Sequence, residues 1–466
     1  MVGICGRLGG RRCHEKPILE ATAMISARDR LVGLVSEPKF HEIPRSELEP
    51  LWLDAANEAL ALKRTHVPVL SRLAQDKGVN EIRRLDDLVP LLFAHSNYKS
   101  YSDSFISKRR WDLMSRWLDT LSATRVAAFD ADDLKDSDDW LDRLKDNGHH
   151  VTVTSGTSGK NSFLPATAFD RDFSLLNFDH EMLRSYGEPR NDRVVVILGP
   201  QDGPHRSVRH FRRLAETMGR PDAVFYLSEE RLRLSDMSRL ARLRAAIGSG
   251  KAKPSEIAAF QQESAARQEA MSMRLEIIVD RILEYRHDPM IILGPWAQMW
   301  TIVELARARG ATAGDFHPNT RVAAGGGTKG ADLPADYQEQ ILGFFGMSAA
   351  DLPNAYGMSE LSAPFAGIDR AYRPPPWVIP LLLDDSGQNL IHQDRSTAEG
   401  RFAFLDLAVD GRWGGVITGD RVTADFSTPN ISIALDSITR YSTAEGGDDR
   451  LTCAGTIDTY VRGIME

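Results

Sequence analysis

Cysteine is scarce in this sequence, with three among 466 residues. Cys5, Cys13 and Cys453 are too few for a disulfide framework, and they lack the paired spacing of a structural zinc site. Such sparing use of cysteine is typical of proteins from a reducing compartment, where thiols stay reduced. We therefore expect a cytoplasmic protein without structural disulfides.

Long apolar runs and an excess of basic charge are also missing. No run reaches the roughly 18 residues that a membrane helix needs, and the basic, glycine-rich residues 1–13 hold no hydrophobic stretch of signal-peptide length. Lysine and arginine number 57 against 65 aspartate and glutamate, which gives a net charge of −8. Because no basic stripe stands out, we expect no nucleic-acid partner and no membrane span.

Hydrophobic residues, in contrast, are plentiful: 42% of the chain is hydrophobic and 26% is charged. That composition is typical of a globular protein that buries one large core or several smaller ones. One basic cluster, His205–Arg213, stands out locally. A solvated helix face is the simpler interpretation of this cluster, and phosphate binding is the alternative.

Two continuous apolar runs predict buried strands. Val194–Ile197 and Ile291–Ile292 lack the polar alternation of a half-exposed strand, and Gly-Pro follows closely after each, where we expect the strand to stop. A long helical pattern that opens at Pro254 separates the two runs. Strands that alternate with helices predict an α/β fold with a parallel component.

The pattern changes to short alternating segments after Arg401, which favours a β-rich lobe. We expect the chain to be organised as an N-terminal extension at 1–45, an α/β core at 46–400, a smaller β-rich lobe of the same domain at 401–454, and a short C-terminal end at 455–466. The core should hold mixed or parallel sheets flanked by helices.

The segment Thr154–Lys160 places two glycines, four hydroxyl side chains and a lysine directly after a β-branched stretch. Phosphate binding needs close approach of the backbone, hydroxyl donors and a positive charge, and the segment supplies all three. It is not a P-loop, because the spacing is G-x-x-G-K rather than G-x-x-x-x-G-K. From this segment alone, a phosphate-binding loop and a flexible surface turn both stay open.

Four segments together resemble the signatures of the acyl-adenylate-forming superfamily, which includes acyl-CoA synthetases, luciferases and the adenylation domains of synthetases. The four segments, which follow the family's order, are Thr154–Lys160, Asn354–Glu360, Thr418–Asp420 and the hinge-like Gly455–Gly463. Of these, Asn354–Glu360 is similar to the family's signature Y-G-x-[ST]-E. The resemblance implies the large N-terminal domain of an adenylate-forming enzyme.

Within that superfamily the sequence looks most similar to the long-chain fatty-acid–protein ligases, the acyl-protein synthetases of bacterial luminescence. Three further stretches carry this likeness: Phe93–Tyr101, Ala324–Lys329 and Gly343–Gly346. The resemblance extends over roughly Leu91 to Arg462.

The resemblance implies ATP and Mg²⁺ as cofactors and assigns roles by matching position. It implies that the phosphates lie on Thr154, Ser155, Gly156, Thr157, Ser158, Gly159 and Lys160. It implies that the rest of the nucleotide and the acyl group lie against Gly325, Gly326, Gly327, Asn354, Tyr356, Gly357, Ser359 and Asp420. Tyr356 would stack on adenine, Ser359 would reach the α-phosphate, and Asp420 would accept hydrogen bonds from the ribose hydroxyls.

The same resemblance implies that Glu360 ligates Mg²⁺ and that Lys160, Glu360 and Cys453 are catalytic. Each assignment has a simpler alternative. Tyr356 is also explained as a buried aromatic, Glu360 as a solvated charge, and Thr418–Asp420 as a hairpin turn. His95 and Lys99 lie in a polar stretch, where a structural role and substrate contact are both open.

Members of the superfamily usually continue past the hinge into a small domain with a catalytic lysine, whereas this sequence ends at Glu466. We therefore expect that domain to be missing or vestigial, as in the fatty-acid–protein ligases. In that family a cysteine near the C-terminus accepts the acyl group, and Cys453 lies in the matching region. Attack of a thiolate on an acyl-adenylate is reasonable chemistry.

The expected function is ATP-dependent activation of a carboxylic acid, expected to be a fatty acid, to acyl-AMP and pyrophosphate. The acyl group would then pass to a protein thiol, either that of Cys453 or that of an acyl-accepting partner such as a reductase. One alternative is transfer to CoA, a carrier protein or an amine, with an aromatic acid as substrate. A binding homologue without turnover is the other.

Overall fold

The computed structural model describes residues 25–154, 160–248, 250, 252–325, 331–392, 396–428, 430–441, 459–461 and 463–465. The α-helices are α1 (Ala27–Gly33), α2 (Arg45–Lys63), α3 (Pro68–Asp76), α4 (Asp103–Ser107), α5 (Trp111–Leu121), α6 (Ser137–Asp146), α7 (Ala168–Tyr186), α8 (Arg206–Met218), α9 (Leu234–Gly248), α10 (Pro254–Glu284), α11 (Trp296–Ala308) and α12 (Tyr337–Phe344). The strands are β1 (Phe93–Ala94), β2 (His150–Val153), β3 (Phe163–Ala166), β4 (Arg193–Asp202), β5 (Gly219–Arg231), β6 (Met290–Pro295), β7 (Arg321–Gly325), β8 (Ala355–Tyr356), β9 (Phe365–Ile368), β10 (Ala371–Arg373), β11 (Val378–Leu383), β12 (Thr397–Asp406), β13 (Gly415–Asp425), β14 (Ser432–Ala434) and β15 (Thr439–Arg440).

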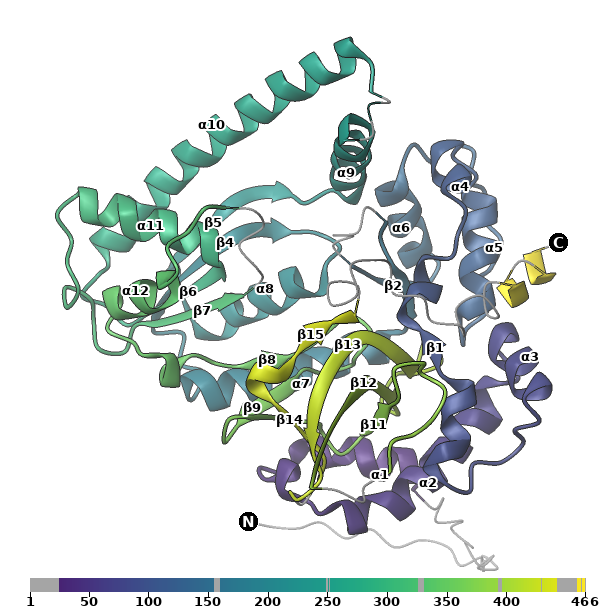
Figure 1. Cartoon of the computed structure of the whole chain (residues 1–466). Coiled ribbons are helices and arrows are strands. Elements are labelled where there is room, and N and C mark those ends of the chain that lie inside the picture. Colours follow the sequence, from purple (N-terminus) through teal and green to yellow (C-terminus); the bar gives the residue numbers. More distant parts are fainter. Residues whose placement is uncertain are drawn as a thin grey trace, which may run out of the picture.

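A parallel sheet with the strand order β5-β4-β6-β7 forms one part of the molecule (Figure 1). Alternate residues of β4 point to opposite faces. Val194 and Val196 share a core with α10, α11 and α12, whereas Val195 and Ile197 pack with α7 and α8. Burial on both faces requires the continuous apolar runs of the sequence. The predicted α/β fold with a parallel component is confirmed.

The prediction that these strands stop at Gly-Pro is confirmed for β6, which ends at Pro295, and is wrong for β4. β4 runs through Pro200 to Asp202, and β6 includes both Gly294 and Pro295. The glycine serves close packing, because a Cβ atom on Gly294 would lie 2.5 Å from Cβ of Leu198 on β4. Pairing between β4 and β5 continues past the proline with a shift of register.

A second, largely antiparallel sheet is built from β8 to β15 together with β1 (Figure 1). Its path is β11-β12-β13-β14-β10-β9-β8, and β13 also pairs with β1 and β15. The sheet packs on a core that contains the buried side chains of Trp52, Trp377 and Trp413. Several distant parts of the chain therefore meet at β13, which carries Thr418 and Asp420.

The β-rich region begins well before the boundary expected at residue 401. That boundary falls inside β12, and β8 to β11 precede it. The burial of β11 explains the difference: all six residues of Val378–Leu383 are buried, so the strand shows no polar alternation. The β-rich lobe is confirmed as a feature of the fold, and it starts at about β8.

Residues 25–45 pack against the core instead of extending from it. Leu31 of α1 and the following Val35 are buried. Arg28 donates hydrogen bonds to the carbonyls of Leu407 at 2.9 Å and Ala408 at 3.1 Å. Of the expected N-terminal extension, residues 1–24 lie outside the described residues. Among the helices that the structure describes, none is both long and apolar enough to cross a membrane.

Candidate functional site

A pocket of about 260 Å³ lies beside β13, and we refer to it as the Glu360 pocket. It is lined by His95, Lys99, Thr154, Ser162, Gly357, Met358, Ser359, Glu360, Thr418, Gly419, Asp420 and Arg440. Three of the four resembling segments contribute to this lining, although they are far apart in the sequence. The predicted residues that they bring together are Thr154, Gly357, Ser359, Glu360 and Asp420.

The hairpin of β2 and β3 holds the two ends of the glycine-rich loop. The Thr154 N–H donates to the Ser162 carbonyl at 3.2 Å, and the Ser162 N–H donates to the Thr154 hydroxyl at 2.8 Å. The side-chain amide of Asn161 donates to the Thr154 carbonyl at 2.7 Å. Residues 155–159 lie outside the described residues, so their binding of phosphate stays a prediction.

Lys160 ends this loop and is not among the residues that line the Glu360 pocket. Its ammonium group forms an ion pair with Asp103 at 3.2 Å, donates to the Tyr101 carbonyl, and lies 4.3 Å from the centre of the Tyr101 ring. The Asp103 side chain is 87% exposed, and ion pairs with such exposed partners are weak. A catalytic role for Lys160 stays a prediction, and it requires that this pair be exchanged for phosphate.

Asp420 is a buried carboxylate that two neighbours hold in place. Its side chain is 2% exposed, and Nε of Arg440 lies 2.8 Å from Oδ1. The Tyr356 hydroxyl donates to Oδ2 at 2.7 Å. Since Thr418–Asp420 lies within β13, the alternative of a hairpin turn does not apply.

The ring of Tyr356 is buried in an aromatic cluster rather than lining the pocket. Its centroid lies 5.6 Å from that of Phe365, 5.9 Å from Tyr372 and 5.7 Å from Phe402. Burial raises the pKa of the Tyr356 hydroxyl, and the adjacent Asp420 raises it further. The hydroxyl therefore stays protonated and acts as the hydrogen-bond donor to Asp420. In this arrangement Tyr356 acts on the pocket through Asp420, and stacking on adenine stays a prediction.

Glu360 brings a second buried carboxylate to the pocket, so it is not a solvated surface charge. The residue is 8% exposed. Burial raises the pKa of its carboxyl group, while the positive charges of Arg412, Arg206 and Lys99 oppose that shift. A cation beside this group would stabilise the ionised form.

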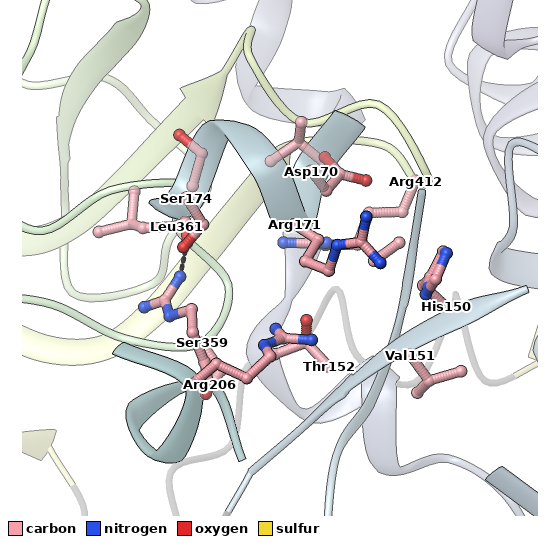
Figure 2. A pocket seen from close by; sticks show the side chains of 14 residues that line it. His150, Val151, Thr152, Asp170, Arg171, Ser174, Arg206, Ser359, Leu361 and Arg412 are labelled. Atoms are coloured by element: carbon pink, nitrogen blue, oxygen red, sulfur yellow. Dashed lines mark hydrogen bonds between the residues drawn. The ribbon is translucent and has the colours of Figure 1, made fainter. Parts of the chain in front are cut away.

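The buried Arg412 and the half-buried Arg206 fix the turn that carries Glu360. Arg206 donates to the carbonyl of Met358 at 2.7 Å. It also donates to the carbonyl of Leu361, the bond drawn in Figure 2. Arg412 donates to the carbonyl of Glu360 at 2.7 Å and to that of Pro165 at 3.1 Å. Backbone carbonyls at this turn are therefore held from α8 on one side and from the loop before β13 on the other.

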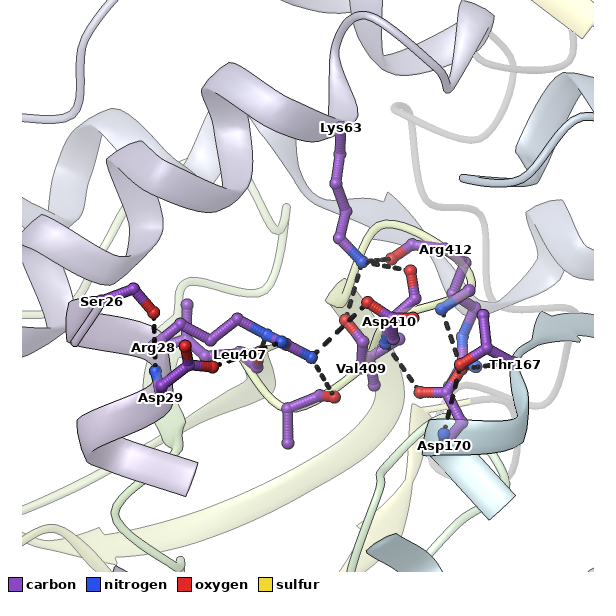
Figure 3. Close-up of polar contacts among 12 residues, drawn as sticks. Ser26, Arg28, Asp29, Lys63, Thr167, Asp170, Leu407, Val409, Asp410 and Arg412 are labelled. Carbon is purple, nitrogen blue, oxygen red and sulfur yellow. Dashed lines mark hydrogen bonds and ion pairs between the residues drawn. The ribbon is translucent and has the colours of Figure 1, made fainter. Parts of the chain in front are cut away.

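The loop that delivers Arg412 is itself held by a buried lysine (Figure 3). Lys63 of α2 donates to the carbonyls of Val409 at 2.7 Å, Asp410 at 2.6 Å and Arg412 at 2.7 Å. The carboxylate of Asp170 accepts hydrogen bonds from the amides of Asp410 and Gly411. Because all three N–H donors of the ammonium group have carbonyl acceptors, Lys63 can be buried to 4% exposure.

Three further residues of the pocket carry positive or titratable groups. His95 and Lys99, whose roles the sequence left open, both line it. Burial lowers the pKa of Lys99, and the nearby Glu360 opposes this shift. Arg440 gave no signal in the sequence, because its place depends on the pairing of β15 with β13, in which it lies opposite Asp420.

The remaining predicted residues lie elsewhere. Asn354 precedes β8 and accepts a hydrogen bond from the Gly367 amide through its main-chain carbonyl at 2.8 Å. Gly325 is the exposed last residue of β7, with open space around the position of an added Cβ atom. Gly326, Gly327 and Cys453 lie outside the described residues, as does most of the hinge-like segment.

A protein-only metal centre is not found in the described part of the chain, where no three His, Cys, Asp or Glu side chains are grouped to hold a metal ion. Mg²⁺ at nucleotide sites usually takes one or two carboxylates and completes its coordination with water and phosphate oxygens. The carboxylate of Glu360 fits such a site as one protein ligand, because the ribose role predicted at this pocket falls to Asp420.

Comparisons with known proteins give little detail: no protein-family model and no curated protein matches this chain. Among solved structures, apo MatB from Rhodopseudomonas palustris aligns with a TM-score of 0.35 and 15% identity, over 61% of this chain and 47% of that chain. An acyl-CoA synthetase (AMP-forming)/AMP-acid ligase II-like protein from Dyadobacter fermentans DSM 18053 aligns with a TM-score of 0.32 and 10% identity, over 66% of this chain and 68% of that chain. This chain thus matches less than half of the length of MatB. Such low similarities carry no argument about activity.

Proposed function

We propose that this chain is an adenylate-forming ligase that activates a carboxylic acid with ATP. A carboxylate oxygen attacks the α-phosphorus, the bond between that phosphorus and the oxygen bridging to the β-phosphate breaks, and acyl-AMP and pyrophosphate form. One observation carries the proposal. Thr154, Ser359, Glu360 and Asp420 line one pocket, in agreement with the order of signatures that the sequence resembles.

Asp420 is suited to the ribose of the nucleotide. A carboxylate has about four acceptor positions, and Tyr356 and Arg440 each occupy one. The remaining positions can accept hydrogen bonds from two vicinal hydroxyl groups. Because its neighbours already hold the carboxylate, little ordering is needed when the ribose binds.

The phosphates of ATP need donors and positive charge rather than a protein nucleophile. Ser359 and Thr154 offer hydroxyl groups in the pocket, and Lys99 and Arg440 offer positive charge. Bound Mg²⁺ would neutralise charge on the phosphates and on the leaving pyrophosphate. Glu360 is the residue that we propose as its ligand.

For the second half-reaction we propose transfer to a protein thiol, as in the fatty-acid–protein ligases. The thiolate sulfur attacks the acyl carbon of acyl-AMP, and AMP leaves. Cys453 is the proposed acceptor, and a long-chain fatty acid is the proposed substrate. This half rests on the resemblance of the sequence alone, and transfer to CoA, a carrier protein or an amine is the alternative.

ATP–pyrophosphate exchange with a panel of fatty, aromatic and short acids tests the first half-reaction. We expect exchange that depends on one class of acid. The Asp420→Asn variant should raise the KM for ATP about tenfold, because one strong acceptor is replaced by an amide. Asp436→Asn is the matched control, since Asp436 is 88% exposed. Absence of exchange with every acid would contradict the proposal.

Labelled acid tests the second half-reaction separately. We expect acyl label on the wild-type chain and no label on Cys453→Ser, with exchange unchanged in both. Exchange without label on the chain would remove the transfer to Cys453 and leave adenylation in place. Release of acyl-CoA on addition of CoA would then identify the alternative acceptor.

A further inference from the structure

A second cavity lies on the other side of the turn that carries Glu360. Four arginines from three parts of the chain surround it, and we call it the arginine cavity: Arg171 of α7, Arg206 and Arg209 of α8, and Arg412 of the loop before β13. Figure 2 shows three of them around the cavity, together with His150 and Thr152. Ser359 lines both this cavity and the Glu360 pocket.

The basic cluster of α8 is therefore divided between two environments. Arg206 and Arg209 are three positions apart, so they share one face of the helix, and both line the cavity. Arg212 and Arg213 lie outside it, where they form ion pairs with Glu216 at 3.2 Å and Asp179 at 2.7 Å. The interpretation as a solvated helix face holds for the second pair of arginines and fails for the first.

Carboxylates leave much of the positive charge in the cavity uncompensated. Arg206 and Arg412 donate to main-chain carbonyls, which carry no net charge. Within the described residues, the Arg209 guanidinium donates no hydrogen bond and forms no ion pair. The charge of Asp172 raises the pKa of Arg209, but the Asp172 carboxylate itself forms an ion pair with Arg171 at 2.9 Å.

Asp170 also lines the cavity, and its acceptor capacity is already in use. Its carboxylate accepts from the backbone amides of Thr167 at 2.8 Å, Asp410 at 2.7 Å and Gly411 at 2.8 Å. Its charge therefore lowers the repulsion among the arginines without forming an ion pair with Arg209. Among the residues that line the cavity, four arginines thus face one carboxylate, while Glu360 and Asp406 act on Arg206 from outside the lining.

The arginines of the cavity repel one another. Burial lowers the pKa of Arg206 to about 10, and Arg412 and Arg209 add to that shift. Burial also lowers the pKa of Arg209, with a further contribution from Arg171. An anion between these groups would remove both penalties, because it replaces lost water and offsets the like charges.

The cavity is small and has a polar wall. Its volume of about 20 Å³ is only a little above the roughly 10–15 Å³ that one water molecule requires, which leaves room for the closely spaced oxygens of one small group and none for an acyl chain or a nucleotide base. Ser359 and Thr152 add hydroxyl groups to the wall. Planar guanidinium groups with several parallel N–H donors are matched to the oxygens of carboxylate and phosphate.

We propose that the arginine cavity binds a single oxyanion group, a phosphate or a carboxylate at the end of a small molecule. Arg209 supplies its donors to that group, while Arg206 and Arg412 supply charge and keep their bonds to the turn. This site is distinct from the nucleotide phosphates proposed for the Glu360 pocket, and it does not depend on the adenylation activity.

Isothermal titration with inorganic phosphate, sulfate and succinate tests the proposal on the full chain, with chloride at equal ionic strength as the reference. Arg209→Gln is the test variant, because the Arg209 side chain forms no hydrogen bond or ion pair with the described residues, so its loss should not unfold the protein. Arg190→Gln is the matched control, since Arg190 is exposed and does not line the cavity. Lys160→Ala reports on phosphate bound by the glycine-rich loop instead.

We expect wild-type chain to bind at least one of these anions below about 10 mM, and Arg209→Gln to weaken that binding about tenfold or more. Arg190→Gln should bind as the wild type does, whereas loss of phosphate binding in Lys160→Ala and not in Arg209→Gln would assign the phosphate to the glycine-rich loop and overturn the proposal. Phosphate binding would identify a phosphate group as the source, and succinate binding without phosphate would identify a carboxylate. Absence of binding by all three anions would overturn the proposal, as would wild-type affinity in Arg209→Gln.

Discussion

The two cavities on either side of residues 357–362 share a wall and differ in the charge that they present. The Glu360 pocket holds two buried carboxylates, Glu360 and Asp420, beside Lys99 and Arg440. The arginine cavity holds four guanidinium groups and one carboxylate that is already engaged. One turn of backbone, fixed by arginines bound to its carbonyls, thus supports two different kinds of site. The side chains on the two sides of this turn, rather than its backbone, therefore determine the charge of the ligand expected on each side.

The largest expected effect separates the two sides most cleanly. Glu360→Gln should lower the rate of ATP–pyrophosphate exchange at least about 100-fold, because an amide is a poor ligand for Mg²⁺. Oxyanion binding in the arginine cavity should hold or tighten, since Arg206 and Arg412 lose a nearby negative charge. Glu399→Gln is the control, because Glu399 is 59% exposed. A parallel loss of both activities would show that the two cavities form one site.

Lys63→Met should affect both sides together through stability. The substitution leaves three carbonyls of the 409–412 loop without their buried donor, and we expect the free energy of unfolding to fall by about 3 kcal/mol. Denaturant unfolding measures it. The exposed Lys77→Met should change this free energy by less than about 0.5 kcal/mol. Equal stability of both variants would mean that the loop does not depend on Lys63.

Tyr356→Phe should have a smaller effect, confined to the carboxylate side. Loss of the hydroxyl that donates to Asp420 should raise the KM for ATP about fivefold with little change in kcat, because Arg440 still holds the carboxylate and only part of the hydrogen-bond energy is lost to binding. Tyr372→Phe is matched to it, because the Tyr372 ring belongs to the same aromatic cluster. A lower kcat with an unchanged KM would contradict a positioning role for Tyr356.

The smallest expected effect is a shift in pH dependence. Burial raises the pKa of Glu360, and activity needs its ionised form, so activity should be lost as pH falls through a pKa above the ordinary value for glutamate. Lys99 lowers this pKa. Lys99→Met should therefore move the acid limb of kcat/KM to higher pH, whereas the exposed Lys108→Met should leave it in place. A shift to lower pH would rule out Glu360 as the group that titrates.

The sequence predicts those parts of the fold in which burial is uniform. Val194–Ile197 is apolar throughout because helices cover both faces of its sheet. Uniform burial also explains why the sequence does not predict β11: all six of its residues are buried, so it lacks the polar alternation by which the β-rich lobe is recognised after residue 401. Gly294 lies at the end of β6 as predicted, and it also serves the close approach of β6 to β4, which the sequence does not reveal.

Prediction of the site shows a similar division. Short motifs identified Thr154, Glu360 and Asp420, and these residues line one pocket. Arg440 could not be recognised, because its surroundings depend on strand register. The sequence singles out the cluster His205–Arg213 but cannot tell which of its arginines face inward, because that depends on helix orientation in three dimensions. For Tyr356 the motif identifies the residue but not its surroundings, because a motif does not show which aromatic side chains pack around the ring.

Identification of the products of ATP cleavage by ³¹P nuclear magnetic resonance tests the central claim most directly. The chain would be incubated with ATP, Mg²⁺ and the acid selected by exchange, beside the Glu360→Gln variant. Attack on the α-phosphorus predicts acid-dependent formation of pyrophosphate and an AMP ester, with little of either in the variant. Formation of ADP and inorganic phosphate would contradict the account, because cleavage would then occur at the γ-phosphorus.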